Sequence, residues 1–108
     1  MKRYYVYILE CSDNLLYTGV TNNISRRLTE HQTGKNINCF TFRRRPVELK
    51  FYEEFNDINQ AIYFEKKIKK WSSTKKRALM DGNYDLLPIL AECRNASHFS
   101  NKEEDENP

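Results

Sequence analysis

Two runs of β-branched and aromatic residues lie close together near the start of the chain and predict a β-hairpin. Residues 4–11 have the sequence YYVYILEC and residues 15–21 the sequence LLYTGVT, with the turn-forming Ser12-Asp13-Asn14 between them. Antiparallel strands joined by so short a connection must pair with each other. The hairpin therefore constrains the fold more than any other feature of the chain.

The length of the hairpin loop decides which side chains share a face of the sheet. A two-residue loop at Asp13-Asn14 would place Tyr17 opposite Glu10 and turn it away from Tyr7. A three-residue loop at residues 12–14 pairs Leu9 with Tyr17 and puts Tyr7 opposite Gly19. We favour the three-residue loop, which brings both tyrosines to one face and leaves open space at Gly19 beside the Tyr7 ring.

The remaining pattern alternates helical and extended segments and predicts a single α+β domain. Helices are expected at about 23–33, from 56–57 onward, and at 72–80, with a weaker helical pattern at 86–93; a loop covers 35–46 and a third strand covers 47–55. In the third strand, Val47, Leu49 and Phe51 are expected on one side. The buried side of the second helix is predicted to consist of Ile58, Ala61, Ile62, Phe64 and Ile68, with Asp57 and Gln60 spaced as a capping box. The order is β-β-α-β-α-α, with a domain at residues 1–95.

Composition excludes several classes of protein. The chain has 108 residues, of which 39% are hydrophobic, enough for one modest core. No run approaches the roughly 20 apolar residues of a membrane span, and the first residues do not resemble a signal peptide. The three cysteines are an odd number without a CxxC pair, and there are only two histidines, which argues against disulfides and a zinc site. A soluble cytoplasmic protein with free thiols is expected, with no membrane partner.

The positive charge is concentrated in the folded part of the chain. Residues 102–108 carry one base and four acids, so the remaining residues hold 17 bases and 11 acids, a net charge of +6 against +3 overall. We expect the polar tail, residues 96–108, to be disordered. Seven of the twelve residues at 66–77 are basic: Lys66, Lys67, Lys69, Lys70, Lys75, Lys76 and Arg77. Such a run is usually a solvated helix face, but the only acid next to it in sequence is Glu65, so phosphate binding is also indicated.

Three charged or polar side chains fall on helix faces that should be apolar. Glu65 lies near the centre of the buried stripe of the second helix, and Arg27 and His31 lie on the inner stripe of the first. A buried carboxylate needs an ion pair, hydrogen bonds or a metal ion, so Glu65 is either a structural partner or a ligand for a hard divalent cation. Arg27 and His31 together could hold a phosphate and relay a proton. A structural Arg27–Glu65 ion pair would explain two of these anomalies at once.

These residues occur in the order and spacing of one nuclease family. Tyr5-Val6-Tyr7 followed by Tyr17-Thr18-Gly19 resembles the paired tripeptides of GIY-YIG nucleases, although Tyr5 replaces a glycine and Thr18 an isoleucine. The segment RLTEH at 27–31 resembles the family's R-x-x-x-H, and Glu65 resembles its metal-binding glutamate. The resemblance covers about residues 3–81 and is greatest to the small, single-domain bacterial group of YhbQ-like endonucleases.

The resemblance implies a three-stranded antiparallel sheet flanked by helices and a single catalytic site. One Mg²⁺ or Mn²⁺ ion would be held by Glu65, and Arg27 would contact the scissile phosphate. Tyr7 would activate the attacking water, with Arg27 and the metal ion acting to lower its pKa and with His31 as proton relay, while Tyr17 would position phosphate or water. Backbone contacts are expected from Lys35, Arg43, Arg44, Arg45, Lys66, Lys69 and Lys70. Asn83 is the only candidate near the end of the domain for a further site asparagine.

The predicted function is metal-dependent endonucleolytic hydrolysis of DNA, with RNA not excluded. We expect none of the additional DNA-binding domains of larger relatives. The expected substrates are therefore structured or damaged DNA in repair or recombination, with a protein partner for target choice as the other possibility. Two alternatives stay open: a non-catalytic nucleic-acid-binding module that keeps the fold and the basic face, and a structural domain in which Arg27 and Glu65 only pair.

Overall fold

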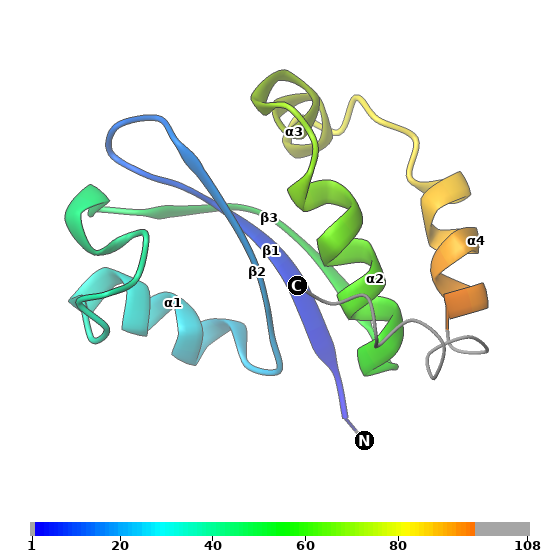
Figure 1. Ribbon diagram of the computed structural model, residues 1–108, viewed down its shortest axis with the longest axis horizontal. Coiled ribbons are helices and arrows are strands. Elements are labelled where there is room, and N and C mark those ends of the chain that lie inside the picture. Colours follow the sequence, from blue (N-terminus) through cyan, green and yellow to red (C-terminus); the bar gives the residue numbers. More distant parts are fainter. Residues whose placement is uncertain (1, 97–108) are drawn as a thin grey trace.

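A three-stranded antiparallel sheet with helices on both sides forms the protein, as predicted (Figure 1). The structure is a computed structural model that describes residues 2–96. Its strands are β1 (Tyr4–Glu10), β2 (Leu16–Thr21) and β3 (Glu48–Phe55), and its helices are α1 (Ile24–Thr33), α2 (Ile58–Lys69), α3 (Ser73–Met80) and α4 (Leu87–Ala96). A 3₁₀ turn, η1 (Phe42–Arg44), interrupts the loop between α1 and β3. From residue 97 onward, the predicted tail lies outside the described residues.

The β1–β2 hairpin has the predicted three-residue loop. The N–H of Cys11 donates to the carbonyl of Leu15 at 2.9 Å, which closes the loop around residues 12–14. Asn14, the last loop residue, has φ 69°, a left-handed conformation that asparagine tolerates better than most residues. The register pairs Leu9 with Tyr17 and Tyr7 with Gly19, so both tyrosines lie on one face of the sheet.

The predicted side-chain pattern of the third strand is wrong at Phe51 because β3 contains a bulge. The order of strands is β2-β1-β3, and β3 pairs Phe51 with Ile8 but Leu49 with Leu9. Lys50 is therefore an extra residue, and the alternation of faces changes at that point. Val47 and Leu49 contact the Tyr7 side of the sheet, whereas Phe51 packs against the core on the other side.

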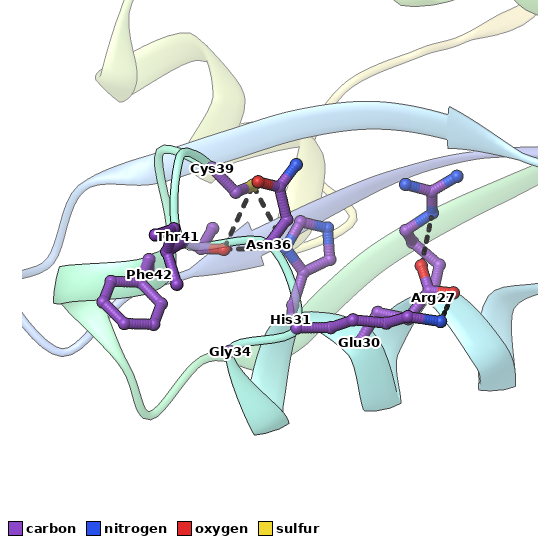
Figure 2. Close-up of a pocket in the computed structure, with 10 residues that line it drawn as sticks. Arg27, Glu30, His31, Gly34, Asn36, Cys39, Thr41 and Phe42 are labelled. Carbon is purple, nitrogen blue, oxygen red and sulfur yellow. Dashed lines mark hydrogen bonds and ion pairs between the residues drawn. The ribbon is translucent and has the colours of Figure 1, made fainter.

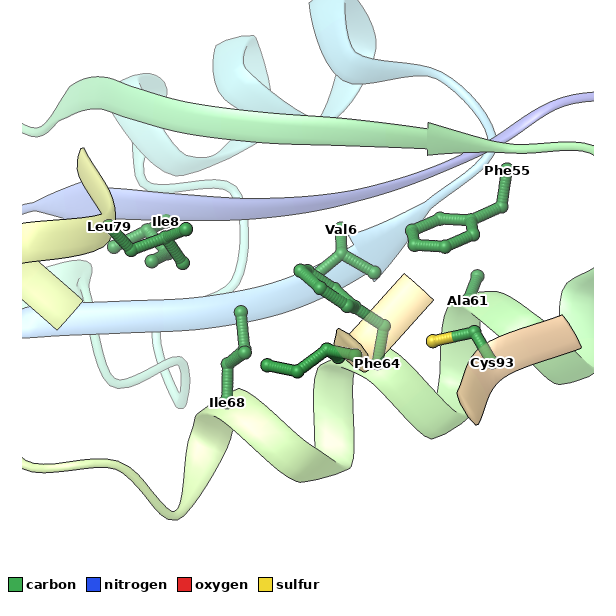
Figure 3. Packing of buried hydrophobic residues seen from close by; sticks show 9 residues of the cluster. Val6, Ile8, Phe55, Ala61, Phe64, Ile68, Leu79 and Cys93 are labelled. Atoms are coloured by element: carbon green, nitrogen blue, oxygen red, sulfur yellow. The ribbon is translucent and has the colours of Figure 1, made fainter. Parts of the chain in front are cut away.

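Each face of the sheet is covered by a different helix (Figure 1). On one face, Val6 and Ile8 pack with Ala61, Phe64 and Ile68 of α2 in the main core, shown in Figure 3. On the other face, a smaller cluster is formed by Tyr7, Leu9, Cys11 and Val47, with Ile24 and Leu28 of α1 packed against it. Since β1 is the central strand, its alternating side chains contribute to both clusters.

The helices begin and end close to the predicted residues. Asn23 and Ser72 cap α1 and α3 by accepting hydrogen bonds from the N–H groups of Arg26 and Lys75, and Gly34 ends α1 in a left-handed conformation. Asp57 caps α2. The buried stripe of α2 is confirmed at Ala61, Phe64, Glu65 and Ile68, but Ile58, in the first turn, is 39% exposed and Ile62 is only partly buried.

All three cysteines are free, as predicted. None of the helices in residues 2–96 is long and apolar enough to cross a membrane.

Gly19 is in direct contact with the ring of Tyr7, so the open space expected beside that ring does not exist. A Cβ atom at residue 19 would lie 2.6 Å from Tyr7 Oη and 2.8 Å from Cζ. Real Cβ atoms do not approach other atoms so closely, so any side chain at residue 19 must displace the ring.

Gly19→Ala is therefore expected to move Tyr7 and to destabilise the fold by about 1–3 kcal/mol, the usual range for overpacking. Chemical denaturation measures the effect. In a Tyr7→Leu background the same glycine substitution should cost much less, because the clashing ring is gone. Equal costs in the two backgrounds would contradict this account of Gly19.

Candidate active site

Tyr7 and His31 form the buried centre of the candidate site. Tyr7 points from the central strand toward α1 and is 3% exposed, and His31 lies on the inner face of α1 and is 5% exposed. The Oη atom of Tyr7 lies 3.2 Å from Nε2 of His31. The helix stripe predicted from the sequence thus places His31 directly against the first tyrosine.

The other ring nitrogen of His31 is held by the loop that follows α1. Nδ1 lies 2.7 Å from Oγ1 of Thr41, which is 1% exposed, and 3.7 Å from Sγ of Cys39 (Figure 2). The Thr41 hydroxyl donates to the Cys39 sulfur at 3.5 Å, which leaves its lone pairs to accept from Nδ1–H. Nε2 is then the unprotonated nitrogen and accepts the phenolic proton of Tyr7.

Tyr17 lies beside this pair at the edge of the sheet. Its ring centroid is 5.1 Å from that of His31 and 6.3 Å from that of Tyr7. On its outer side, Phe40 stacks against it at 6.0 Å, and the Arg44 guanidinium lies 4.1 Å over the Phe40 ring. The second tyrosine is thus packed between the histidine and an exposed aromatic residue of the loop.

Arg27 reaches the same side of the sheet but does not pair with Glu65. Its Nε lies 3.6 Å from a carboxylate oxygen of Glu30, too far for a hydrogen bond, and that buried Nε has no hydrogen-bond partner within the described part of the chain (Figure 2). Glu65 pairs instead with Lys69, at 3.2 Å. Arg27 and Glu65 belong to helices on opposite faces of the sheet, so the single structural ion pair considered from the sequence is not formed.

Glu65 is buried, as its place on the helix predicts, with 8% of its surface exposed. Its neighbour Lys69 is an exposed ammonium one turn further along α2. Glu65, Lys69 and Arg27 all affect the pKa of Tyr17. Tyr17 lies on the edge strand β2, where charged groups from α1 and α2, on opposite faces of the sheet, both act on it electrostatically.

Burial shifts the pKa values of Tyr7, Tyr17 and His31 in the direction that favours their neutral forms. Burial raises the pKa of Tyr7 well above 10, with a further increase from Tyr17; Arg27 lowers it, as expected, but by less. The predicted direction of the effect of Arg27 on the Tyr7 pKa is therefore confirmed, but burial outweighs it. Burial also raises the pKa of Tyr17. It lowers the pKa of His31 below 6.5, and Arg27 lowers it further.

Comparison with known proteins agrees with this arrangement. The profile of the GIY-YIG catalytic domain matches residues 3–78. The chain belongs to the GIY-YIG family. A UPF0213 protein of Syntrophus aciditrophicus is 46% identical over 81% of this chain and 100% of its own length, and one from Staphylococcus haemolyticus is 40% identical over 75% and 98%. The solution structure of a protein from E. faecalis is 32% identical, with a TM-score of 0.55 over 76% of this chain and 86% of that one.

The basic residues proposed from the sequence fall into two groups. Several are engaged within the fold: Arg44 pairs with Asp13 at 3.1 Å, Arg45 lies over the Phe42 ring, and Lys35 and Lys69 pair with Glu30 and Glu65. Lys66, Lys70 and Arg43 form no ion pair in residues 2–96. The 66–77 run is also divided, because Glu92 pairs with Lys67 and Glu10 with Arg77. Acids distant in sequence thus compensate part of the run, which the sequence pattern did not indicate.

The donor set around Glu65 suits one kind of metal ion. Within residues 2–96, no group of three or more His, Cys, Asp or Glu side chains is placed to hold a metal. A single buried carboxylate does suit Mg²⁺ or Mn²⁺, because such ions keep several waters and take further oxygen ligands from substrate phosphates. The residues present therefore fit the ion that GIY-YIG membership implies, provided that Lys69 gives way.

Four residues near the site were not identified from the sequence. Thr41 and Cys39 lie in an irregular loop without periodicity, and Glu30 does not belong to the inner stripe that marked Arg27 and His31. Lys76, assigned to a solvated face, is 8% exposed; burial lowers its pKa, Lys69 lowers it further and Glu65 opposes the shift.

Asn83 occupies an exposed turn after α3, with its N–H bonded to the carbonyl of Ala78. It makes no contact with the site among the interactions of residues 2–96.

Thr41→Val tests the assignment of the His31 tautomer. Valine keeps the shape of threonine but leaves the buried Nδ1–H with only the weak sulfur acceptor of Cys39, so the fold should lose about 1–3 kcal/mol. The ¹⁵N shifts of the His31 ring, measured by NMR, should report a smaller population with the proton on Nδ1. Thr41→Ser should retain the wild-type tautomer. An unchanged tautomer in Thr41→Val would show that the hydroxyl does not determine it.

The lowered pKa of His31 predicts a pH dependence of stability. The unfolded chain binds a proton at His31 near pH 6.5, whereas the folded chain binds it only at lower pH. As the pH falls below about 6.5, unfolding takes up a proton, so the free energy of unfolding decreases. His31→Asn should lack this contribution. Denaturation of both proteins between pH 7.5 and 5 should show the stability advantage of wild type shrinking toward acid; a constant difference would contradict the shift.

Proposed function

We propose that the protein is a metal-dependent endonuclease that hydrolyses DNA phosphodiester bonds. The observation that carries the proposal is the buried chain of contacts from Tyr7 through His31 to Thr41, with Arg27 beside it. A structural domain has no need of a neutral histidine held in one tautomer beneath a tyrosine and next to an incompletely bonded arginine. Residues 1–95 would form the nuclease domain and residues 96–108 an acidic tail, in a cytoplasmic protein.

Tyr7 and His31 act together as the general base. Tyr7 accepts a proton from the attacking water and transfers its own phenolic proton to Nε2 of His31, so the phenol does not have to ionise. The raised pKa of Tyr7 is compatible with this relay, whereas it would hinder a free phenolate. His31 can accept the proton because its lowered pKa keeps the imidazole neutral near pH 7.

The other charged residues hold the phosphate. Arg27 turns from Glu30 to the scissile phosphate, where its charge offsets the negative charge that develops during the attack. Tyr17, between α1 and α2, positions a phosphate oxygen or the water. Glu65 would hold one Mg²⁺ or Mn²⁺ ion, which supplies positive charge to the phosphate and the leaving oxygen. Lys66, Lys70 and Arg43, which are not paired within residues 2–96, are the best placed to contact the backbone at a distance from the cut, on DNA or RNA.

A cleavage assay tests the proposal. Purified wild type is incubated with flapped, branched and duplex DNA, and with a matching RNA, with Mg²⁺, with Mn²⁺ and with EDTA. We expect cleavage only with a divalent ion, and a loss of at least about 100-fold in Glu65→Gln and Tyr7→Phe, the range for removing one catalytic group. Cleavage at repair or recombination structures would connect the activity to those processes.

Matched variants separate catalysis from damage to the fold. Glu48→Gln removes an exposed carboxylate that pairs with Lys50, and Tyr52→Phe removes the hydroxyl of an exposed tyrosine. Both should cut like wild type. If Glu65→Gln and Tyr7→Phe also cut like wild type, the mechanism is wrong. If wild type binds DNA but cuts none of these substrates, the protein is instead a nucleic-acid-binding module, the alternative that the basic side chains allow.

A further inference from the structure

A pocket of about 420 Å³ opens beside the candidate active site (Figure 2). The C-terminal half of α1 forms one wall and residues 35–42 of the following loop form the other. The pocket shares Arg27 and His31 with the site, so a group bound in it would be adjacent to a phosphate held by Arg27. Its volume is within the range of roughly 300–1,000 Å³ typical of small-molecule sites.

The segment that follows α1 is fixed to the helix by four hydrogen bonds and by close packing at Gly34. The side-chain amide of Gln32 exchanges two hydrogen bonds with the backbone of Val47, and Thr41 bonds His31. The N–H of Lys35 donates to the carbonyl of Glu30. At Gly34 an added Cβ would lie 2.5 Å from the Arg45 guanidinium and 3.0 Å from the Phe42 ring, so the loop packs directly on the end of the helix. The pocket is therefore formed before any ligand binds.

The lining of the pocket combines an aromatic ring with polar groups that can bond the edge of a base. Phe42, Ile37 and Cys39 provide apolar surface, and Asn36 and Glu30 provide an amide and a carboxylate. The Arg45 guanidinium lies 4.6 Å from the Phe42 centroid and holds that ring in place. Asparagine and carboxylate side chains recognise the donors and acceptors of base edges, and apolar and aromatic side chains contact base faces.

The charges favour a base over a second phosphate. Glu30 contributes a carboxylate to the lining, which repels phosphate. Three cations, Arg26, Arg27 and Lys35, lie 3.6–3.9 Å from this carboxylate, and Arg27 and Lys35 also line the pocket. A nucleotide whose phosphate lies at Arg27 and whose base points inward places its negative charge beside a cation and its uncharged base beside the carboxylate.

We propose that this pocket binds the base of an unpaired nucleotide adjacent to the scissile phosphate. A base that is paired and stacked in a duplex cannot enter a pocket, and the cost of extruding it is least where it is already unpaired. The preferred substrate is therefore DNA with an unpaired nucleotide, such as a bulge, a flap or a single strand. The inference rests on the proposed function for the position of the cut, but the binding of the base does not require cutting.

Binding to bulged DNA in EDTA tests the pocket without cleavage. Fluorescence anisotropy compares a duplex that has a one-nucleotide thymine bulge with the same duplex in which the bulged residue is abasic. Wild type should bind the thymine bulge about tenfold more tightly, as expected for one stacked base. Phe42→Leu should reduce this ratio toward one. Asn36→Ser, which keeps an acceptor for the N–H of Asn38, should reduce it in part.

Tyr52→Leu is the matched control, because it removes an exposed aromatic ring outside the pocket. It should keep the wild-type ratio, and a fold defect in Phe42→Leu would weaken both duplexes equally without changing the ratio. Equal binding of both duplexes by wild type overturns the proposal, as does a ratio that Phe42→Leu leaves unchanged.

With Mg²⁺ added, cutting should occur within one nucleotide of the bulge. If wild type binds the thymine bulge more tightly than the abasic one but cuts no DNA, the proposed base pocket is supported and the nuclease assignment is wrong. If DNA is cut equally well at bulged and abasic sites, the nuclease assignment is supported and the proposal of a base pocket is wrong. If neither duplex is bound, both are wrong.

Discussion

The contact between the Tyr7 ring and Gly19 is the constraint on which the site depends. It exists because the three-residue loop sets the β1–β2 register and places these two residues opposite each other. Any side chain at residue 19 would occupy the position of the ring, so the ring could not lie flat on β2 and reach His31 at 3.2 Å. A hairpin register, a local property of a few residues, thus fixes the first step of the contact chain that leads to Thr41.

The edge position of β2 explains how a site can use helices on opposite faces of one sheet. In a wider sheet, another strand would lie beside Tyr17. That strand would separate the charged groups above the sheet from those below it. Here β2 has no neighbour beyond it within residues 2–96, so Arg27 from α1 and Glu65 from α2 both influence the pKa of Tyr17. The exposed edge is covered in part by Phe40, which stacks on Tyr17.

The sequence predicted the parts of this structure that follow from period and local chemistry. The hairpin register, the caps and the burial of Glu65 all depend on nearest neighbours or on a helical repeat. The face of Phe51 could not be predicted, because a bulge depends on the partner strand and leaves no mark in the alternation. Thr41 and Glu30 were missed for a related reason: their roles depend on how an aperiodic loop packs on α1. The pairing of some basic residues at 66–77 with acids was also missed, because those acids, such as Glu10, are distant in sequence.

Glu65 shows why a buried carboxylate in this fold remains available for a ligand. Its burial must be compensated, and Lys69 does so at 3.2 Å from a position that is 60% exposed. An ion pair with so exposed a partner contributes at most about 1 kcal/mol and holds its partner weakly. Lys76, buried near the same carboxylate, adds positive potential without an ion pair of its own within residues 2–96. The burial of Glu65 is therefore compensated by nearby ammonium groups, while its closest partner can turn into solvent when a stronger cation arrives.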